Sequence, residues 1–532
     1  MKKTIIIGIV GVMPLAGFAQ SAPDAYQLNQ TDLRGTARFV SMAGAFTALG
    51  GDLTTLGQNP AGLGVYRTSE VGATLDVNMQ NVKSTLGFSS LSDSQTKVGC
   101  SNVGYVGSTK FGSGSSSVYF NWGFTYGRVG SFDRRYRGAS DHSAGSLTNY
   151  VAGYSSAEGM ASKDLNGYDP SYDPFQQGRM PWMSVLMYNS YGMNPSNDNS
   201  TDYEGLYNGT PGRKTFTVDE TGYVDEYNIN FGGSVFNTIY WGIGFGITDI
   251  NYSNYTYYTE SFDNATIPSA SGNGRTTGSA DYGYESYKHM SGSGFNFKIG
   301  VIAKPINELR IGFAFHTPTY YNINYDGWAQ TQFDYSSGIN GYYPNTNTAG
   351  CDDYFSFKMR TPWRMMLGVA GVIGRNAIVS VDYEYRPFNQ MVVKDDMGYE
   401  YRDISSQIKD DYSGVNIIRV GAEYRLTQNF SVRLGYSWQG SSATASAKDG
   451  YVYTTGPDDT ETQPSFTTDG SINYVTAGIG YHYKAFYIDA AYVYRNRSSN
   501  WHAYTASADN PSTVAKLKDT QNSLVFSLGF KF

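Results

Sequence analysis

The sequence predicts an all-β fold: a transmembrane antiparallel β-barrel of about fourteen strands, with an N-terminal plug (hatch) inside the lumen. Three observations support this prediction. The chain starts with an export signal, many segments carry apolar residues at every second position, and the connections alternate between short and long. A period of two places successive side chains on opposite faces of a strand. A strand with lipid on one side and a polar lumen on the other requires that pattern.

Residues 1–19 are typical of a secretory signal peptide. Lys2 and Lys3 precede an apolar run that ends in small residues, and we expect cleavage before Gln20. No later stretch of about 18 residues is apolar and uncharged enough for a helical span. We therefore expect the mature chain to leave the cytoplasm and to cross the cell outer membrane of a Gram-negative bacterium with strands.

The last strand shows the alternation most clearly. Apolar residues from Leu524 to Phe532 share one face, and small or polar residues occupy the other. We expect outer-membrane lipids around the apolar face and recognition of the aromatic C-terminus by the barrel-assembly machinery. Segments of this kind predict strands at residues 67–80, 101–111, 116–129, 223–236, 239–257, 283–304, 308–325, 354–373, 376–388, 413–426, 428–441, 471–483, 485–497 and 520–532.

Tight turns and long polar loops alternate strictly between these segments. Short periplasmic turns and long outer loops are typical of outer-membrane barrels, and an even strand number puts both termini in the periplasm. The barrel is predicted over residues 64–532, with loops at residues 81–100, 130–222, 258–282, 326–353, 389–412, 442–470 and 498–519, of which 130–222 is the largest.

Charged residues within the predicted strands lie on the face opposite the apolar stripe. They would point into the lumen, where an unpaired charge is costly. We interpret them mainly as a structural network that fills the lumen or binds the plug, with direct substrate contact as the alternative. The predicted lumen charge network contains Arg310, Asp382, Glu384, Arg419, Glu423 and Arg433.

Residues 20–63 do not have the pattern of a strand. They are rich in Gly and Ala and end in an Asn-Pro-Ala-Gly-Leu motif at residues 59–63, which favours sharp turns. A barrel of about fourteen strands leaves a hole unless something fills it. The predicted plug or gating residues are Gly44, Asn59, Pro60, Ala61 and Gly62.

The plug motif, the Gly44-Ala45 stretch with Asp52, and strand segments at residues 310–318, 419–425 and 478–481 resemble the FadL/TodX family of outer-membrane transporters for hydrophobic compounds. The resemblance implies a fourteen-stranded barrel closed by an N-terminal hatch. It also implies that long-chain fatty acids or aromatic hydrocarbons are captured in a pocket and leave sideways into the outer leaflet. Such a route keeps an apolar ligand out of water.

A second function remains open: a similar barrel that acts as a protein-interaction or secretion-shuttle component, with a surface or secreted protein as its partner. The long loop at residues 130–222 favours this alternative. A general diffusion porin is disfavoured by the predicted plug.

Residues 180–188 are the most apolar part of the long loop. Their helical spacing and adaptable Met side chains suit a ligand-contact site, and they equally suit a small core that holds the loop together. The candidate ligand-contact residues are Trp182, Met183, Val185, Leu186 and Met187.

The remaining chemistry-bearing residues are sparse. Cys100 and Cys351 both map to outer strand ends, where they either pair in an oxidising compartment or stay apart. The five histidines form no metal or catalytic motif, so we predict no enzyme activity, cofactor or metal site. The net charge of −7 gives no reason to expect nucleic acid.

Overall fold

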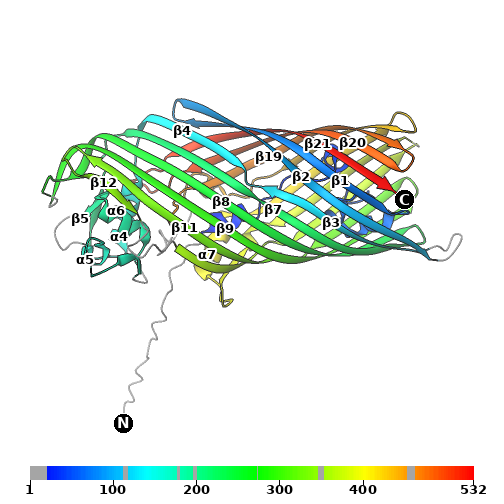
Figure 1. Ribbon diagram of the computed structural model, residues 1–532, viewed down its shortest axis with the longest axis horizontal. Coiled ribbons are helices and arrows are strands. Elements are labelled where there is room, and N and C mark those ends of the chain that lie inside the picture. The colour runs from blue at the N-terminus through cyan, green and yellow to red at the C-terminus, as the bar shows by residue number, and fades with distance from the viewer. Residues whose placement is uncertain are drawn as a thin grey trace, which may run out of the picture.

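The computed structural model describes residues 21–111, 118–169, 171–176, 180–195, 201–271, 274–344, 353–374, 376–451 and 462–532; the predicted signal peptide lies outside them. These residues form a closed antiparallel barrel of fourteen wall strands (Figure 1), some of them in two pieces, as predicted. In order around the wall they are β1 (Glu70–Leu86), β2 (Ser89–Phe111), β3 (Val118–Ser131) with β4 (Arg134–Ser143), β7 (Gly212–Val235), β8 (Ile239–Pro268), β9 (Arg275–Ile306), β10 (Leu309–His316) with β11 (Tyr320–Tyr335), β13 (Asp353–Arg360) with β14 (Arg364–Ile373), β15 (Ala377–Pro387) with β16 (Val392–Asp395), β17 (Gly414–Arg425), β18 (Phe430–Gln439), β19 (Phe466–Tyr483), β20 (Phe486–His502) and β21 (Val514–Lys531).

Most wall strands extend further outward than the sequence pattern predicts. The predicted loop 81–100 is instead a strand pair, in which β1 and β2 stay in register up to a turn at Gly87, where φ is +58°. The predicted loop 130–222 begins as β4 and ends as β7, which leaves residues 144–211 between them. Beyond the membrane both faces of a strand can be polar, so the alternation fades although the hydrogen-bonded ladder continues.

Strand β8 shows where the apolar outer surface of the wall ends. At residues 239–247 the outward side chains are apolar and the inward positions are mostly glycine. From Asp249 onward the outward residues are polar, and the inward residues include the buried Tyr258 and Phe262. A membrane-spanning strand needs about 9–11 residues, whereas β8 has 30. More than half of this strand therefore projects beyond the apolar belt.

The described residues between 144 and 211 cap the end of the barrel that carries the long loops. Figure 1 shows its helices at the end opposite the C-terminus. Its buried Leu147, Met183 and Leu186 belong to the same apolar core as inward residues of the wall, among them Tyr282 and Trp501. The cap and the outer wall therefore share one core. The elements of the cap are α4 (Leu147–Ala157), α5 (Ser162–Leu165), η3 (Pro174–Gln176), α6 (Trp182–Asn189), β5 (Met193–Pro195) and β6 (Tyr203–Gly205).

The chain ahead of β1 runs through the lumen as short helices joined by turns. Thr36 caps the second of them by accepting a hydrogen bond from the Phe39 amide, and Asn59 caps the last by accepting one from the Ala61 amide. These helices are α1 (Ala22–Leu28), α2 (Ala37–Ser41), α3 (Thr55–Gln58) and η1 (Pro60–Val65). Within the described residues no helix has the length and hydropathy to cross a bilayer. Smaller elements of the outer half are β12 (Asn340–Pro344), η4 (Phe388–Gln390), α7 (Arg402–Asp411) and α8 (Ala445–Lys448).

The first described helix lies on the outer side of the plug. Helix α1 packs against α7 in a core that includes the inward-facing Ile250 and Tyr252 of β8, beyond the apolar belt. Phe532 lies at the opposite, short-turn end (Figure 1). The expectation that both termini lie in the periplasm stays a prediction. An even strand number places the two ends of the wall on one side, but here the chain crosses the lumen before the wall begins.

Deleting Phe532 is expected to impair assembly of the barrel. The Phe532 amide donates to the Ser69 carbonyl (3.0 Å), and the Phe532 carbonyl oxygen accepts from the Ser69 amide (2.9 Å), so the deletion removes the terminal pair of bonds between the first and last strands of the wall. The fraction that migrates fast without boiling on a gel measures closed barrel, and it should fall for this variant. Phe88→Ala, at the exposed tip of the β1–β2 turn, is the control. Equal fractions for the two variants would contradict the prediction.

Candidate functional site

The plug rests on glycines of the inner wall. A Cβ at Gly300 of β9 would collide with the side-chain oxygen of Asn59, and one at Gly242 of β8 would collide with the carbonyl of Pro60. Residues without a side chain permit this close approach between backbones. Other wall glycines at which a Cβ would meet a plug atom within 3.0 Å are Gly72, Gly123, Gly130, Gly312, Gly368, Gly421, Gly435 and Gly478.

Asn59 organises the turn that the sequence motif predicts. Its side-chain oxygen accepts a hydrogen bond from the Ala61 amide (3.0 Å), and its Nδ2 donates to the Thr47 carbonyl (2.6 Å). Pro60 starts η1, where its missing N–H is not needed. Asn59 therefore joins the two halves of the plug while it lies on the wall.

Gly44 and Gly62 hold the plug together by their backbones. Gly44 has a φ of +74°, and its carbonyl accepts a hydrogen bond from Gln58 Nε2 at 3.0 Å. The Gly62 carbonyl accepts one from the Gly51 amide at 3.2 Å. The structure buries all five predicted plug residues in the lumen; their gating role stays a prediction.

Ion pairs fasten the plug to the wall on the side of β17 and β18. Arg38 of α2 lies 3.0 Å from Glu423, and Arg433 lies 2.6 Å from both Glu423 and Asp489. The Arg38 guanidinium of the plug thus shares Glu423 with Arg433 of the wall. Glu423 and Arg433 were predicted to face the lumen. The contact of Glu423 with Arg38 agrees with the plug-binding interpretation, and Arg433 takes part through Glu423.

Two further predicted residues bind the plug through its backbone. Asp382 accepts a hydrogen bond from the Thr47 amide at 2.8 Å, and Arg310 Nη1 donates to the Leu49 carbonyl at 2.7 Å. Neither belongs to the same ion-pair group as Glu423. The predicted network is therefore several separate contacts around one plug.

Glu384 forms a cluster of its own with three arginines. Its carboxylate lies 2.9 Å from Arg364, 2.7 Å from Arg419 and in contact with Arg386. Three guanidinium groups face one carboxylate, which leaves two positive charges unmatched within the cluster. Arg419 Nη1 is buried without a hydrogen-bond partner among the described residues. The sequence analysis missed Arg364 and Arg386, although Arg386 shares the parity of Glu384 on β15.

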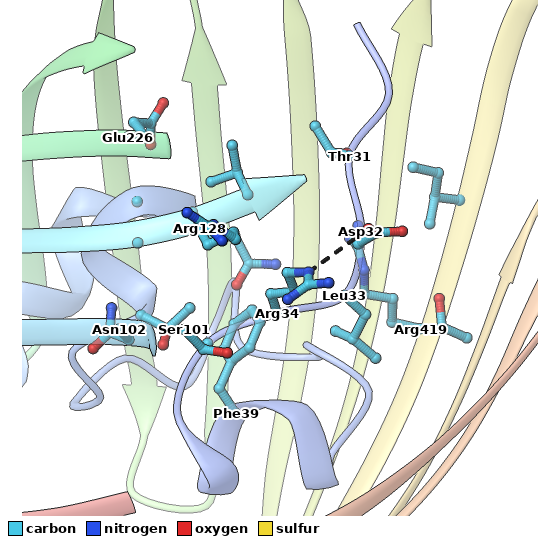
Figure 2. Close-up of a pocket in the computed structure, with 18 of the residues that line it drawn as sticks. Thr31, Asp32, Leu33, Arg34, Phe39, Ser101, Asn102, Arg128, Glu226 and Arg419 are labelled. Carbon is cyan, nitrogen blue, oxygen red and sulfur yellow. Dashed lines mark ion pairs between the residues drawn. The ribbon is translucent and has the colours of Figure 1, made fainter. Parts of the chain in front are cut away.

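The arginine cluster borders a cavity of about 120 Å³ beside the plug, partly open to solvent. Figure 2 shows the loop that carries Thr31 to Arg34 beside Phe39, with Arg128 and Arg419 entering from the wall. Leu33, Phe39 and Ile417 contribute apolar surface next to the guanidinium groups. The lining is therefore amphipathic. It includes Asp32, Arg34, Ser101, Asn102, Arg128, Val129, Glu226, Arg364, Arg386, Arg419 and Tyr474.

Two carboxyl groups of the plug respond differently to burial. Burial by itself would raise the pKa of the Asp32 carboxyl, but Arg495 and Arg34 outweigh burial and hold that pKa below its usual value. Burial raises the pKa of the Asp52 carboxyl, even though Arg38 and a hydrogen bond from Thr36 (2.8 Å) oppose the shift. Arg34 also bonds Asp76 of β1 at 3.0 Å, so the cavity loop is tied to the wall at its charged residues.

The apolar segment of the long loop does not face the outside. Trp182, Met183, Val185, Leu186 and Met187 are all buried in the core shared by the cap and the wall. The burial agrees with a core that holds the loop together and leaves no exposed landing site at these residues. Cys100 lies on β2, and Cys351 lies outside the described residues. Among the residues that the structure describes, no group of three His, Cys, Asp or Glu side chains is placed to hold a metal ion.

Comparison with known proteins places the fold. No protein-family model matches the sequence, and no curated protein matches it. A crystal structure of a FadL homologue from Pseudomonas aeruginosa is similar, with 12% identity, a TM-score of 0.53, and coverage of 94% of this chain and 99% of that chain. The toluene transporter TodX from P. putida aligns with 14% identity and a TM-score of 0.47 over 94% of this chain and 99% of that chain. At this sequence distance, the similarity to the FadL homologue shows that this chain has a divergent FadL-like barrel fold.

Proposed function

We propose that the protein spans the outer membrane and carries amphipathic hydrophobic molecules, long-chain fatty acids in particular, across it. The cavity beside the plug carries this proposal, because it combines apolar walls with guanidinium groups that no carboxylate of the cluster matches. A fatty acid has an apolar chain and a carboxylate, which pairs well with Arg. An aromatic hydrocarbon has no charge to use these groups, so we favour the fatty acid.

The plug favours capture in a pocket over diffusion through a pore. Its backbone lies against wall glycines such as Gly242 and Gly300, and Arg38 ties it to Glu423. A polar solute would have to break these contacts to pass. An apolar ligand gains free energy by leaving water for the cavity. We propose that the ligand enters from the capped end and leaves sideways into the outer leaflet.

We also propose which end of the barrel faces which side of the membrane. The short turns and Phe532 would face the periplasm, while α1, the cap and the long strands would face the outside. The alternative, a barrel that binds a surface or secreted protein, relied on the long loop. The most apolar residues of that loop, Trp182 to Met187, are buried in the internal core and are not available to a partner protein. We therefore prefer transport.

Arg419→Gln is expected to reduce uptake of a long-chain fatty acid roughly tenfold to a hundredfold, because a hydrogen bond to a charged group contributes about 1.5–3 kcal/mol. Glu384 keeps two arginine partners in this variant, so the wall should still close. Uptake of the labelled acid by whole cells measures the effect. Arg425→Gln, at an exposed position of the same strand, is the matched control.

An uncharged ester of the same acid separates ligand recognition from general damage. Its uptake should be the same in Arg419→Gln and wild type. If uptake of the acid is equal in both variants, in wild type and in cells without the protein, the transport proposal is wrong.

A further inference from the structure

An open groove of about 440 Å³ lies on the outer surface of the wall, where β8, β9, β11, β13 and β16 are neighbours. The register of the strands determines which residues form the base of this groove. Ile247, Phe295, Tyr320, Arg360 and Val392 are successive cross-strand partners in one row. Ile247, Phe295 and Tyr320 are exposed on the outside of the barrel, and the rings of Phe295 and Tyr320 stack at 5.7 Å. This row is the outer edge of the apolar belt.

The next row outward is polar and basic. Ser293, Asn322, Lys358 and Lys394 are successive partners, each two residues further from the belt than the apolar row. Two lysines and Arg360 therefore gather directly above exposed aromatic side chains. Because residues opposite each other on neighbouring strands share a face, these cations point to the outside of the barrel.

These three cations have no carboxylate partner in the described part of the chain. Arg360 Nε is buried without a hydrogen-bond partner, and Lys358 Nζ donates only to the Asp396 backbone carbonyl. The nearby Asp395 carboxylate instead accepts from the Tyr399 amide at 2.7 Å. A buried guanidinium nitrogen without a partner is costly, so an external anion would satisfy it.

The turn that follows β16 overhangs the groove. Gly398 lines the cavity, and its neighbours Met397 and Tyr399 are 78% and 73% exposed. Aromatic and apolar residues beside Lys and Arg are typical of the boundary between lipid chains and headgroups. Of this turn, Gly398 borders the groove itself.

We propose that this groove binds a phosphorylated glycolipid of the outer leaflet, with acyl chains on Ile247, Phe295 and Tyr320 and a phosphate between Arg360, Lys358 and Lys394. Charge complementarity and the adjoining apolar row both favour such a lipid over a soluble anion. The proposal rests on the outer-membrane location proposed above, but not on transport through the lumen.

Native mass spectrometry of the full chain in neutral detergent tests the proposal with diphosphorylated lipid A as the probe. The triple variant Lys358→Gln, Arg360→Gln, Lys394→Gln should bind lipid A on the order of a hundredfold more weakly than wild type, because each cation contributes about fivefold near an anionic lipid surface. The matched control is Lys83→Gln, Lys516→Gln, Lys518→Gln. These lysines are exposed and lie on the neighbouring strands β1 and β21, beyond the belt. The control should bind like wild type.

Two further probes complete the test. Lipid A without its phosphates should bind weakly to every variant, and inorganic phosphate should not displace lipid A at the same concentration. Equal binding by the two triple variants, or equal binding of the phosphate-free lipid, would overturn the glycolipid site. Displacement by inorganic phosphate would show a site for free anions instead. Fatty-acid uptake by the wild-type protein is measured in a separate assay. If the wild-type protein binds lipid A through these cations but takes up no fatty acid, only the transport proposal is contradicted.

Discussion

Gly300→Val is expected to make the barrel leak small polar solutes. A side chain at this position of β9 would occupy the place of the Asn59 oxygen, and Asn59 is held there by its bonds to Thr47 and Ala61. Overpacking a tight contact costs roughly 1–3 kcal/mol, which shifts the population of the seated plug by about tenfold to a hundredfold. The rate at which cells take up a bulky polar antibiotic should rise by a similar factor.

Gly371→Val is the matched control. Gly371 lies on β14 and has no atom within 4 Å of an added Cβ, so valine there tests the cost of a β-branched residue in the wall without touching the plug. Gel mobility without boiling should show a closed barrel for both variants. If both variants take up the antibiotic at the wild-type rate, the contact between Gly300 and Asn59 does not keep the plug closed.

The fold could be predicted because the membrane imposes a strict pattern on each strand. Apolar residues such as Ile243 and Phe245 alternate with inward glycines, and this alternation located all fourteen wall strands. It could not locate their outer ends. Past the apolar belt the outward face becomes polar and the apolar residues move to the inward face, as with Val82 and Leu86, so the pattern of a lipid-facing stripe disappears while the ladder persists.

The candidate site was partly visible for a similar reason. The motif at Asn59 contains turn formers, so its position outside the wall followed from local chemistry. The cluster around Glu384 depends on Arg364 of β14 and Arg419 of β17, which are far apart in sequence and meet only through strand pairing. The wall glycines that contact the plug are visible in the sequence as inward positions, but a glycine does not reveal which segment packs against it.

Glu384→Ala is expected to destabilise the barrel by about 3–5 kcal/mol, because removing one partner from a buried ion pair leaves its counter-charges uncompensated. Arg364, Arg386 and Arg419 would then face one another without a carboxylate. The temperature at which the fast-migrating band converts to the slow one should fall. Glu308→Ala, in an exposed short turn, should leave it unchanged. Adding Arg386→Gln to Glu384→Ala should recover part of the loss; if the two losses simply add, charge repulsion is not the cause.

The same variant connects stability with the proposed ligand. If the cavity takes a fatty-acid carboxylate at the arginine cluster, that carboxylate can occupy the place of the missing Glu384 side chain. A ligand that binds only the folded state stabilises it, and at a given concentration a tighter ligand stabilises it more. A long-chain fatty acid should therefore raise the conversion temperature of Glu384→Ala more than that of wild type, and its methyl ester should not. Equal shifts with acid and ester would mean that the acid binds elsewhere, and the arginine cluster would then serve only to hold the wall around the plug.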